Sequence, residues 1–368
     1  MNKSAKRLVC LAMMLAVTLS VTAACADSGN DVLQEEYSAR RITNFSNLCR
    51  GGELYLDSMQ RLNFIDFTSM NSSLICPYPN CAHADPNVCP SFGMNICPVM
   101  YENNIYYFTS QVEYEADGPV LKTYINKADI DGTNRMQLAE YDNILVADYT
   151  MLLVYDDKFY FCPNTAVFDE YANMSTSDRS DMCLYSYSFT DNKFTMIEKL
   201  CEGYSCGAWI YGMYDGEIYM HVNYSDEPYD YMLVEQQDFT TEFLKYNPQD
   251  NTVSRLDFAV NYASGGYLLT SEGVGIYDKM TLHLPGGKTK DVPWFEDAVV
   301  YNGYIFDRIS QRAYRISDDT MYVLNTDDFM TEVVGYENDM YILRSYDSDA
   351  GGYAYAAVPE EELIGSQV

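Results

Sequence analysis

Residues 101–108 read YENNIYYF: a tyrosine, a turn-forming pair, and then a strand of apolar and aromatic residues. The same order returns as RGGELYL (50–56), YDDKFYF (155–161), YDGEIYM (214–220), YNGYIF (301–306) and YENDMYIL (336–343). Asn, Asp and Gly tolerate the positive φ angles of the tight turns that join antiparallel strands. Each copy therefore predicts a β-hairpin.

Further strand–turn–strand patterns lie between these copies. Their turns fall at Asp131-Gly132, Asp191-Asn192 and Asp250-Asn251, each between two short apolar runs. One repeat then contains four antiparallel strands, which is the composition of a propeller blade. The sequence predicts an all-β fold, a β-propeller.

The spacing of the copies predicts the number of blades. The first turn residues of the six copies lie 52, 53, 59, 87 and 36 residues apart, and the longest step has room for a degenerate copy near Gly265-Gly266. We expect seven blades, with six or eight as alternatives, and a last blade that is incomplete or shared with the N-terminal strand. Tandem β-sandwiches remain the alternative fold, because turns and alternation do not show that a ring closes.

The repeats resemble known propeller families. Residues 124–135, YINKADIDGTNR, are similar to a strand–turn–strand unit of TolB-like and YWTD-type propellers. The Tyr-Asp-Gly-x-Ile-Tyr strands resemble those of exported propeller proteins of Gram-positive bacteria. The resemblance covers most of residues 50–345. It implies a location at the cell surface and a binding or scaffolding role, and it identifies no catalytic residue in this sequence.

The N-terminus has the pattern of a secretion signal. Three basic residues within the first seven precede an apolar run over residues 8–21, followed by small residues. This order is typical of a signal peptide, and the run is short for a membrane span. We therefore expect a signal peptide over residues 1–24, an acidic tether with an N-terminal strand over 25–47, a propeller over 48–361 and a tail over 362–368.

Cys25 follows the small residues directly. This placement resembles the lipobox of bacterial lipoproteins, which implies a lipid on Cys25 and a protein anchored at the cell surface. Thr22 stands where that family usually has Leu, so ordinary cleavage near Ala26 and secretion remain the alternative.

The acidic composition restricts the partners. The net charge is −31, and removal of the signal peptide with its three basic residues makes it −34. Nucleic acids and anionic lipid surfaces attract basic patches. We expect no nucleic-acid partner, membrane contact only through the N-terminal lipid, and a monomer that binds an extracellular ligand or protein.

A cysteine cluster is the sharpest local feature. Cys76, Cys81, His83 and Cys89 fall within fourteen residues. Three thiolates and an imidazole are the ligands of a structural Cys3His zinc site, although the spacing matches no standard zinc finger. Export favours oxidation, so we expect these cysteines to form disulfides, with the zinc site as the alternative.

Nine cysteines remain beyond residue 25. If zinc took three of them, six would be left for three disulfides. Cys162 and Cys183 fall on successive predicted strands and form the first candidate pair, and Cys201 and Cys206 could close a short loop.

A second metal candidate is Asp129-x-Asp131-Gly132-x-Asn134, which resembles part of a calcium loop. It lacks the distal Glu of an EF-hand, so we expect a hairpin turn. Structural zinc or calcium are thus the two candidate cofactors, and the first expectation is that the protein has none.

No nucleophile-elbow, zinc-protease or phosphate-loop motif occurs in the sequence. The leading functional hypothesis is a ligand-binding or protein-interaction propeller rather than an enzyme. One alternative is an extracellular carbohydrate-active enzyme with paired carboxylates in the propeller channel. Another is a structural protein of the cell envelope.

Overall fold

The computed structural model describes residues 46–49, 51–146, 150–165, 167–168, 174–175, 179–228, 238–273, 279–326, 331–347 and 352–368. These ranges consist almost entirely of antiparallel strands, with one short helix, α2 (Glu360–Leu363). No helix within them has the length and apolar character needed to cross a bilayer. The predicted signal peptide and Cys25 lie outside the described residues.

The described strands form seven antiparallel blades, which we number in chain order. Blade one contains β1 (Ser46–Cys49), β2 (Gly52–Leu56), β3 (Leu62–Asp66) and β4 (Asn71–Leu74). Blade two contains β5 (Ile96–Tyr101), β6 (Asn104–Glu115), β7 (Gly118–Asp129) and β8 (Met136–Asp142). Blade five contains β20 (Ala259–Ser264), β21 (Tyr267–Ser271), β22 (Lys279–His283) and β23 (Thr289–Pro293).

Blades three and four share one continuous strand, β16 (Lys193–Tyr214). Blade three contains β10 (Leu152–Tyr155), β11 (Lys158–Phe161), β15 (Ser180–Ser188) and the first half of β16. Blade four contains the second half of β16 with β17 (Glu217–Ser225), β18 (Thr240–Asn247) and β19 (Thr252–Arg255). Four short strands accompany blade three: β9 (Ile144–Leu145), β12 (Asn164–Thr165), β13 (Val167–Phe168) and β14 (Met174–Ser175).

The last two blades depart from four strands. Blade six contains β24 (Ala298–Tyr301), β25 (Tyr304–Asp307), β26 (Arg312–Arg315), β27 (Thr320–Leu324) and, as a fifth strand, β31 (Ile364–Gln367). Blade seven contains β28 (Glu332–Glu337), β29 (Met340–Asp347) and β30 (Gly352–Pro359). Within the described residues blade seven thus has three strands, in line with an incomplete last repeat, one of the two predicted outcomes.

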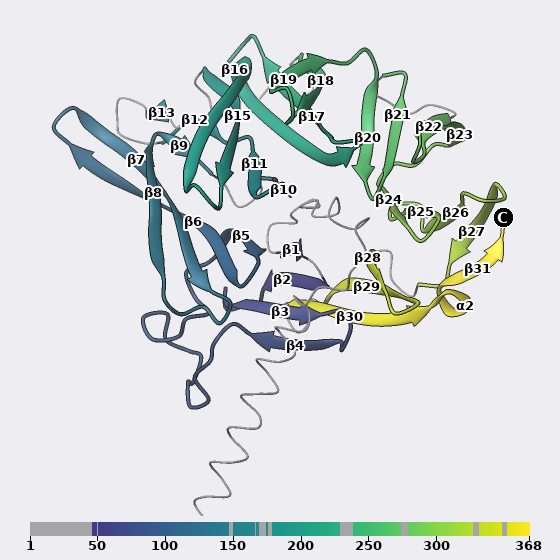
Figure 1. Ribbon diagram of the computed structural model, residues 1–368, viewed down its shortest axis with the longest axis horizontal. Helices are drawn as coiled ribbons and strands as arrows, with labels where there is room; N and C mark the ends of the chain where they lie inside the picture. Colours follow the sequence, from purple (N-terminus) through teal and green to yellow (C-terminus); the bar gives the residue numbers. More distant parts are fainter. Residues whose placement is uncertain are drawn as a thin grey trace, which may run out of the picture.

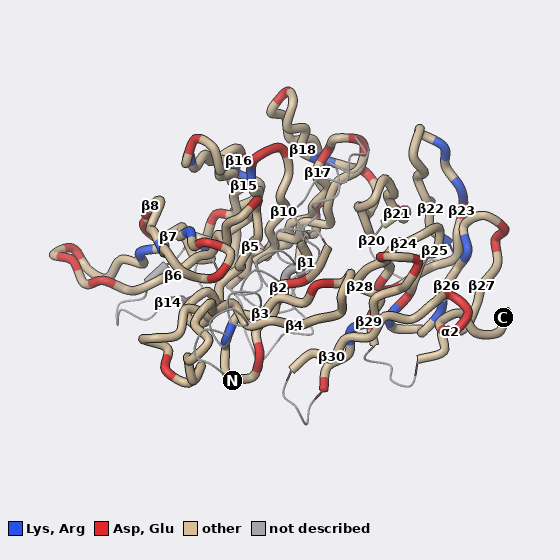
Figure 2. The backbone as a smooth tube through the Cα atoms, turned by 60° about the horizontal axis from the view of Figure 1, so that its bottom comes forward, with Lys and Arg blue, Asp and Glu red and all other residues tan. Residues whose placement is uncertain are grey.

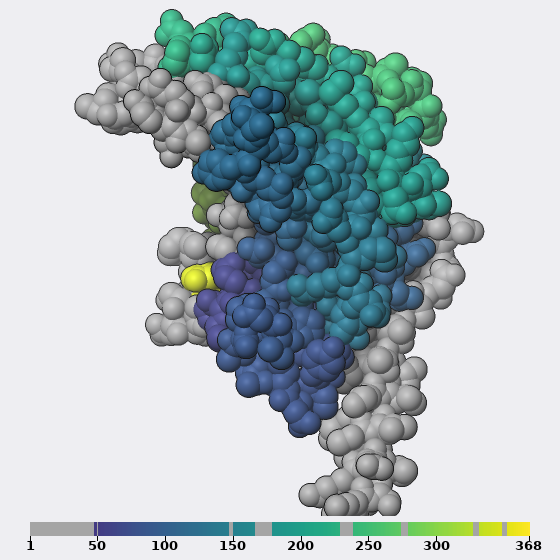
Figure 3. Space-filling model, turned by 90° about the vertical axis from the view of Figure 1, so that its left-hand side faces the viewer, coloured from purple at the N-terminus to yellow at the C-terminus, as the bar shows by residue number. Residues whose placement is uncertain are grey.

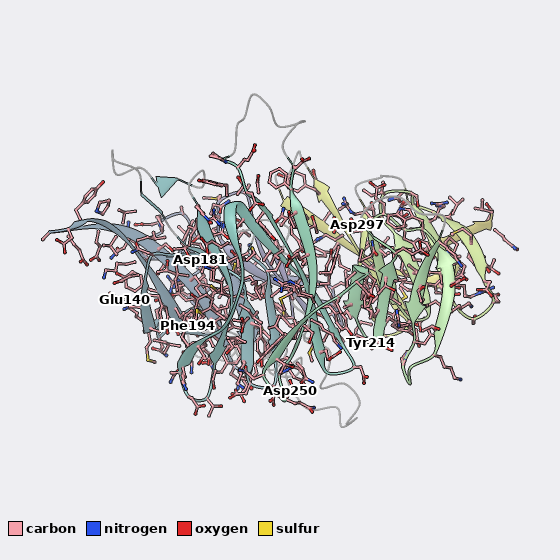
Figure 4. All side chains as sticks on the ribbon, turned by 90° about the horizontal axis from the view of Figure 1, so that it is seen from above. Glu140, Asp181, Phe194, Tyr214, Asp250 and Asp297 are labelled. Carbon is pink, nitrogen blue, oxygen red and sulfur yellow. The ribbon has the colours of Figure 1, made fainter. Side chains whose placement is uncertain are left out.

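The blades follow one another around a ring. Figure 1 shows the colours running from purple through teal and green to yellow, where blade seven lies beside blade one. The connections between first and second strands and between third and fourth strands project on one side of the ring, the turn face, and the remaining connections project on the other, the loop face. Seen from above, Tyr214 and Asp250 mark the turn face, whereas Asp181 and Asp297 lie toward the loop face (Figure 4). The predicted β-propeller is confirmed.

The repeated turn pairs explain the blade count. Each pair joins the first and second strands of a blade. Its residues adopt the left-handed backbone conformation, as at Asp156 and Asp157 (φ 48° and 59°). The degenerate copy does the same, with Gly265 and Gly266 at φ 58° and 75° between β20 and β21. Seven predicted repeats therefore correspond to the seven blades of the described chain.

The C-terminal boundary of the propeller differs from the prediction. Residues 362–368 were expected to form a tail beyond a propeller ending at 361. Instead β31 pairs with β27, and Leu363 is 1% exposed in the core of blade six. A backbone hydrogen bond from Asn325 to Leu363 (2.8 Å) holds the junction. At the other end, β1 begins at Ser46, two residues before the predicted start.

Side-chain packing closes the ring between blades one and seven. Tyr55, Ile65 and Phe67 of blade one share a buried cluster with Val334 and Ile342 of blade seven. Figure 2 shows acidic positions spread over the described blades, with fewer basic ones between them.

Candidate metal centre

The segment between β4 and β5 leaves the regular blade pattern. Residues 75–95 contain neither strand nor helix, as their prolines predict. The segment lies on the outside of the ring, at the lower left of Figure 1, and the side view of Figure 3 shows the same dark-blue region at the lower end of the described blades. Such an excursion needs ties to the blades, because it has no sheet partners of its own.

Contacts from both neighbouring blades hold this segment. The backbone N–H of Leu62 donates to the carbonyl of Ser91 (2.8 Å), and Arg61 Nη1 donates to the carbonyl of His83 (3.2 Å). From blade two, Arg135 donates to the carbonyls of Phe92 (2.7 Å) and Pro90.

Gly132 permits the approach of the segment to blade two. Its φ is +80°, and a Cβ at this position would meet the carbonyl oxygen of Pro90 at 2.8 Å and Ile75 at 3.1 Å. A larger residue would therefore both strain the turn and push the segment away.

Cys76, Cys81, His83 and Cys89 converge in this segment. One ligand atom from each lies within 4.8 Å of all the others. His83 Nδ1 is 3.3 Å from Cys89 Sγ, and the backbone N–H of His83 points at Cys81 Sγ at 3.4 Å. Cys89 is buried and the other three are half-buried. The His83 ring faces the sulfurs, as the zinc hypothesis requires and the disulfide hypothesis does not.

The arrangement fits a tetrahedral ion. With Zn–S bonds of about 2.3 Å and Zn–N bonds of about 2.0 Å, tetrahedral geometry places ligand atoms about 3.5 to 3.8 Å apart. The 3.3 Å between His83 and Cys89 lies near the lower value, and the other ligand atoms, within 4.8 Å of one another, would close by up to about 1 Å around the ion. Three sulfurs and one nitrogen are also a donor set that structural zinc prefers.

The electrostatics of the cluster single out Cys89. Burial opposes its ionisation, but hydrogen bonds from Ser91 Oγ (3.0 Å to the sulfur) and from His83 prevail and lower its pKa to about 6. Burial raises the pKa of Cys76 to about 12. Cys89 therefore carries the first thiolate, and a bound cation would displace the protons of the others.

The other predicted cysteine pairs are not bonded. Cys162, Cys183, Cys201 and Cys206 form no disulfide bond. Cys162 follows β11 directly, and Cys183 lies on the neighbouring strand β15. Cys162 packs with Met182 and Leu184 in the core cluster of blades three and four, and Cys183, between these two residues in the sequence, is not part of that cluster.

Cys201 and Cys206 do lie together. Their thiols share a hydrogen bond, which lowers the pKa of Cys206 to about 7 and raises the pKa of Cys201. Cys206 Sγ also reaches the carbonyl of Ser180 at 3.4 Å. The predicted pair is therefore in contact as two thiols.

The candidate calcium loop forms the hairpin turn between β7 and β8. The carbonyl of Asp129 accepts a hydrogen bond from the N–H of Gly132 (2.8 Å), and its carboxylate accepts one from Asn134 Nδ2 (2.6 Å). The carboxylate of Asp131 is bound by Thr133 Oγ1 (2.6 Å). These carboxylates stabilise the turn that the flanking strands predicted.

The residues that support the cluster were not predicted from the sequence. Ser91, Arg61 and Arg135 are neither cysteine nor histidine, and two of them come from other parts of two blades. Only Ser91, two residues after Cys89, has a local signal, since a hydroxyl so near a thiol can donate to it.

Comparison with known proteins gives fold-level similarity. No family model matches the chain, and no curated protein sequence matches it either. An acylaminoacyl peptidase of Pyrococcus horikoshii is 12% identical with a TM-score of 0.48, over 89% of this chain and 53% of that one. The propeller domain of the trilobed protease from Pyrococcus furiosus is 10% identical (TM-score 0.39; 88% and 90% covered). An α-L-arabinanase of Penicillium chrysogenum, complexed with arabinobiose, is 9% identical (TM-score 0.37; 92% and 96% covered).

The chain spans about half the length of the acylaminoacyl peptidases that it resembles. Identities of 9–12% are too low to transfer an activity from any of these proteins. The function is therefore argued from the site itself.

Proposed function

We propose that this protein is an exported, non-enzymatic binding propeller in which Cys76, Cys81, His83 and Cys89 hold a structural zinc ion. The observation that carries the zinc assignment is the convergence of the four ligand atoms within 4.8 Å. Four protein ligands fill the tetrahedral positions of zinc and leave none open for a substrate, so the ion has a structural role.

Zinc would hold an otherwise weakly tied segment against two blades. Structural zinc in small domains contributes about 10 to 16 kcal/mol of binding free energy, which becomes folding free energy when the site forms only on folding. The segment contacts blade one through Leu62 and blade two through Arg135. Fixing it therefore fixes the junction between these blades.

Export and lipid anchoring belong to the proposal on the strength of the N-terminal sequence. The basic start, apolar run and small residues before Cys25 support it. Replacement of Cys25 by Ala should release a folded protein into the medium, and an unlipidated mature N-terminus beyond residue 25 in the membrane fraction would contradict the anchor.

The enzyme hypothesis requires two carboxylates that face a substrate across an open site. Glu53 and Glu332, from blades one and seven, both form ion pairs with Arg344 instead. An arginine between two carboxylates neutralises them and occupies the space between them. For this pair the arrangement favours a role in holding the blades together.

The test of the zinc site is metal content. Protein purified under reducing, metal-replete conditions should contain about one zinc ion per chain by mass spectrometry of the metal. Cys81→Ser and His83→Ala should each lower that content strongly. Cys97→Ser is the matched control, because Cys97 is buried and donates to the carbonyl of Thr150 (3.2 Å) away from the cluster.

A wild-type protein without zinc, or one in which two of the three cluster cysteines form a disulfide after reducing purification, would contradict the proposal. Loss of zinc in the Cys97→Ser control would also count against it, since it would show that metal content follows general folding.

A further inference from the structure

A cavity of about 210 Å³ lies between blades three and four. Strands β9, β12, β15, β16 and β17 contribute to its wall. The lining belongs to the loop face, because it includes Asn164 and Met182, which flank the connection between β11 and β15, the second and third strands of blade three. Six residues define its character: Asn164, Cys206, Gly207, Trp209, His221 and Asn223.

Two alternate residue pairs of the β16–β17 ladder build one wall. Trp209 lies directly opposite His221, and Gly207 lies directly opposite Asn223. Residues two apart on a strand share a face, so these four positions point to the same side of the sheet.

Gly207 makes room for the side chain across from it. A Cβ at this position would meet Asn223 Oδ1 at 2.3 Å, closer than any real contact. The amide of Asn223 therefore lies over the backbone of Gly207, at the cavity wall. Asn164, whose Nδ2 donates to the carbonyl of Cys206 (3.3 Å), adds a second amide to the lining.

The aromatic pair of this wall, Trp209 and His221, presents parallel ring planes. The rings of Trp209 and His221 are nearly parallel, 12° apart, with centroids separated by 6.3 Å. Tyr211 Oη binds His221 Nδ1 at 2.8 Å and fixes the orientation of the imidazole. Burial lowers the pKa of His221 to about 4, so the ring is neutral at neutral pH.

Among the described residues that line the cavity there is no Asp, Glu, Lys or Arg. This is unusual for a chain with 54 acidic and 23 basic residues, in which most surfaces carry charge. An ionised ligand group would lose its hydration here without meeting an opposite charge, which is costly. The chemistry of the wall therefore selects an uncharged ligand that has one apolar face and several hydrogen-bonding groups.

We propose that this cavity binds one neutral sugar ring of the pyranose type. The C–H face of such a ring would stack on Trp209 and His221, and its hydroxyls would bond the amides of Asn164 and Asn223. A volume of about 210 Å³ is below the range of about 300 to 1,000 Å³ typical for drug-sized ligands, so the cavity takes a single ring. This inference rests on the proposed binding role and does not depend on zinc.

The test uses tryptophan fluorescence. The chain has two tryptophans, and Trp294→Phe leaves Trp209 as the reporter. In this background we would titrate glucose, galactose, mannose and N-acetylglucosamine up to about 10 mM, which saturates a site with a Kd of about 1 mM. Glucuronate, a pyranose with a carboxylate, is the matched charged probe.

At least one neutral sugar should change the fluorescence saturably, and glucuronate should not. Asn223→Ala should weaken binding about tenfold through the lost hydrogen bonds. Gly207→Ala should weaken it similarly, because its Cβ displaces the amide of Asn223. The zinc content of both variants should equal that of the parent, which separates this site from the zinc proposal and reports folding.

Absence of saturable binding for all four neutral sugars would overturn the inference. Equal binding of glucuronate, or unchanged binding in both variants, would do so as well. Sugar binding by a protein without zinc would refute the zinc proposal and leave this one standing.

Discussion

His221 is a half-buried imidazole among aromatic rings. It lies opposite Trp209, bonds Tyr211 and packs near Phe243, whose ring centroid is 5.7 Å away. Desolvation lowers its pKa to about 4, below the usual value of 6.5. An unfolded chain therefore binds this proton more readily than the folded protein does between these two pH values.

Protonation of His221 should consequently lower the free energy of unfolding as the pH falls from about 6.5 toward 4. The total decrease should be about 3 kcal/mol. In His221→Phe this part of the pH dependence should disappear, so the unfolding free energies of variant and wild type should diverge at low pH. Urea unfolding at several pH values measures it. His283→Phe is the comparison, because His283 is less buried and its pKa is lowered less.

An unchanged pH dependence in His221→Phe would show that the imidazole is already protonated or solvated in the folded protein.

Strand β16 carries the contact between Cys201 and Cys206. The ladder with β17 is irregular between Tyr204 and Gly207, and Ser205 has a φ of 51°. The irregularity brings two thiols five residues apart into hydrogen-bond contact, which a regular strand would not do.

Oxidised glutathione should convert these two thiols to a disulfide. Cys206, with its pKa near 7, attacks first; the two thiols give up two protons and two electrons, and glutathione leaves as two reduced molecules. Peptide mass mapping should find Cys201 linked to Cys206, while Cys97 stays alkylatable after unfolding. Two reactive thiols at 201 and 206 after this treatment would contradict the prediction.

The strands that the sequence could predict are those with local turn signals. Asn302-Gly303 and Asp156-Asp157 require left-handed backbone, so the hairpins follow from the residues alone. The place of β31 could not be predicted, because Ile364–Gln367 has no such signal and only the burial of Leu363 in blade six positions it. The continuity of β16 was missed for the same reason, since its two halves belong to different blades.

In the candidate metal site, too, the local features could be predicted from the sequence and the contacts between blades could not. The spacing of Cys76, Cys81, His83 and Cys89 gave the donor atoms, because they lie in one short segment. The contact of Arg135 with the carbonyl of Phe92 depends on how blade two packs against that segment, so it has no signature in the sequence.

The ring closes by contacts between its first and last blades. Arg344 of blade seven forms ion pairs with Glu332 (2.6 Å) and with Glu53 of blade one, and Glu53 is fully buried. Its guanidinium also lies 4.8 Å from the ring centre of Tyr353. A cation held between two carboxylates in the interior is costly to remove, because the carboxylates are then left without it.

Arg344→Met should therefore destabilise the protein by about 3 to 5 kcal/mol in urea unfolding. Lys279→Met is the control: the ion pair of Lys279 with Asp291 is exposed and should contribute less than about 1 kcal/mol. A loss in Arg344→Met no larger than that of the control would show that the network does not hold the ring closed.

The zinc proposal is tested most directly by X-ray absorption at the zinc edge of the purified, reduced protein. We expect three sulfur ligands at about 2.3 Å and one nitrogen ligand at about 2.0 Å, with the nitrogen signal lost from the zinc that His83→Ala still binds. A spectrum with only oxygen and nitrogen ligands, or a nitrogen signal that persists in His83→Ala, would contradict the Cys3His site.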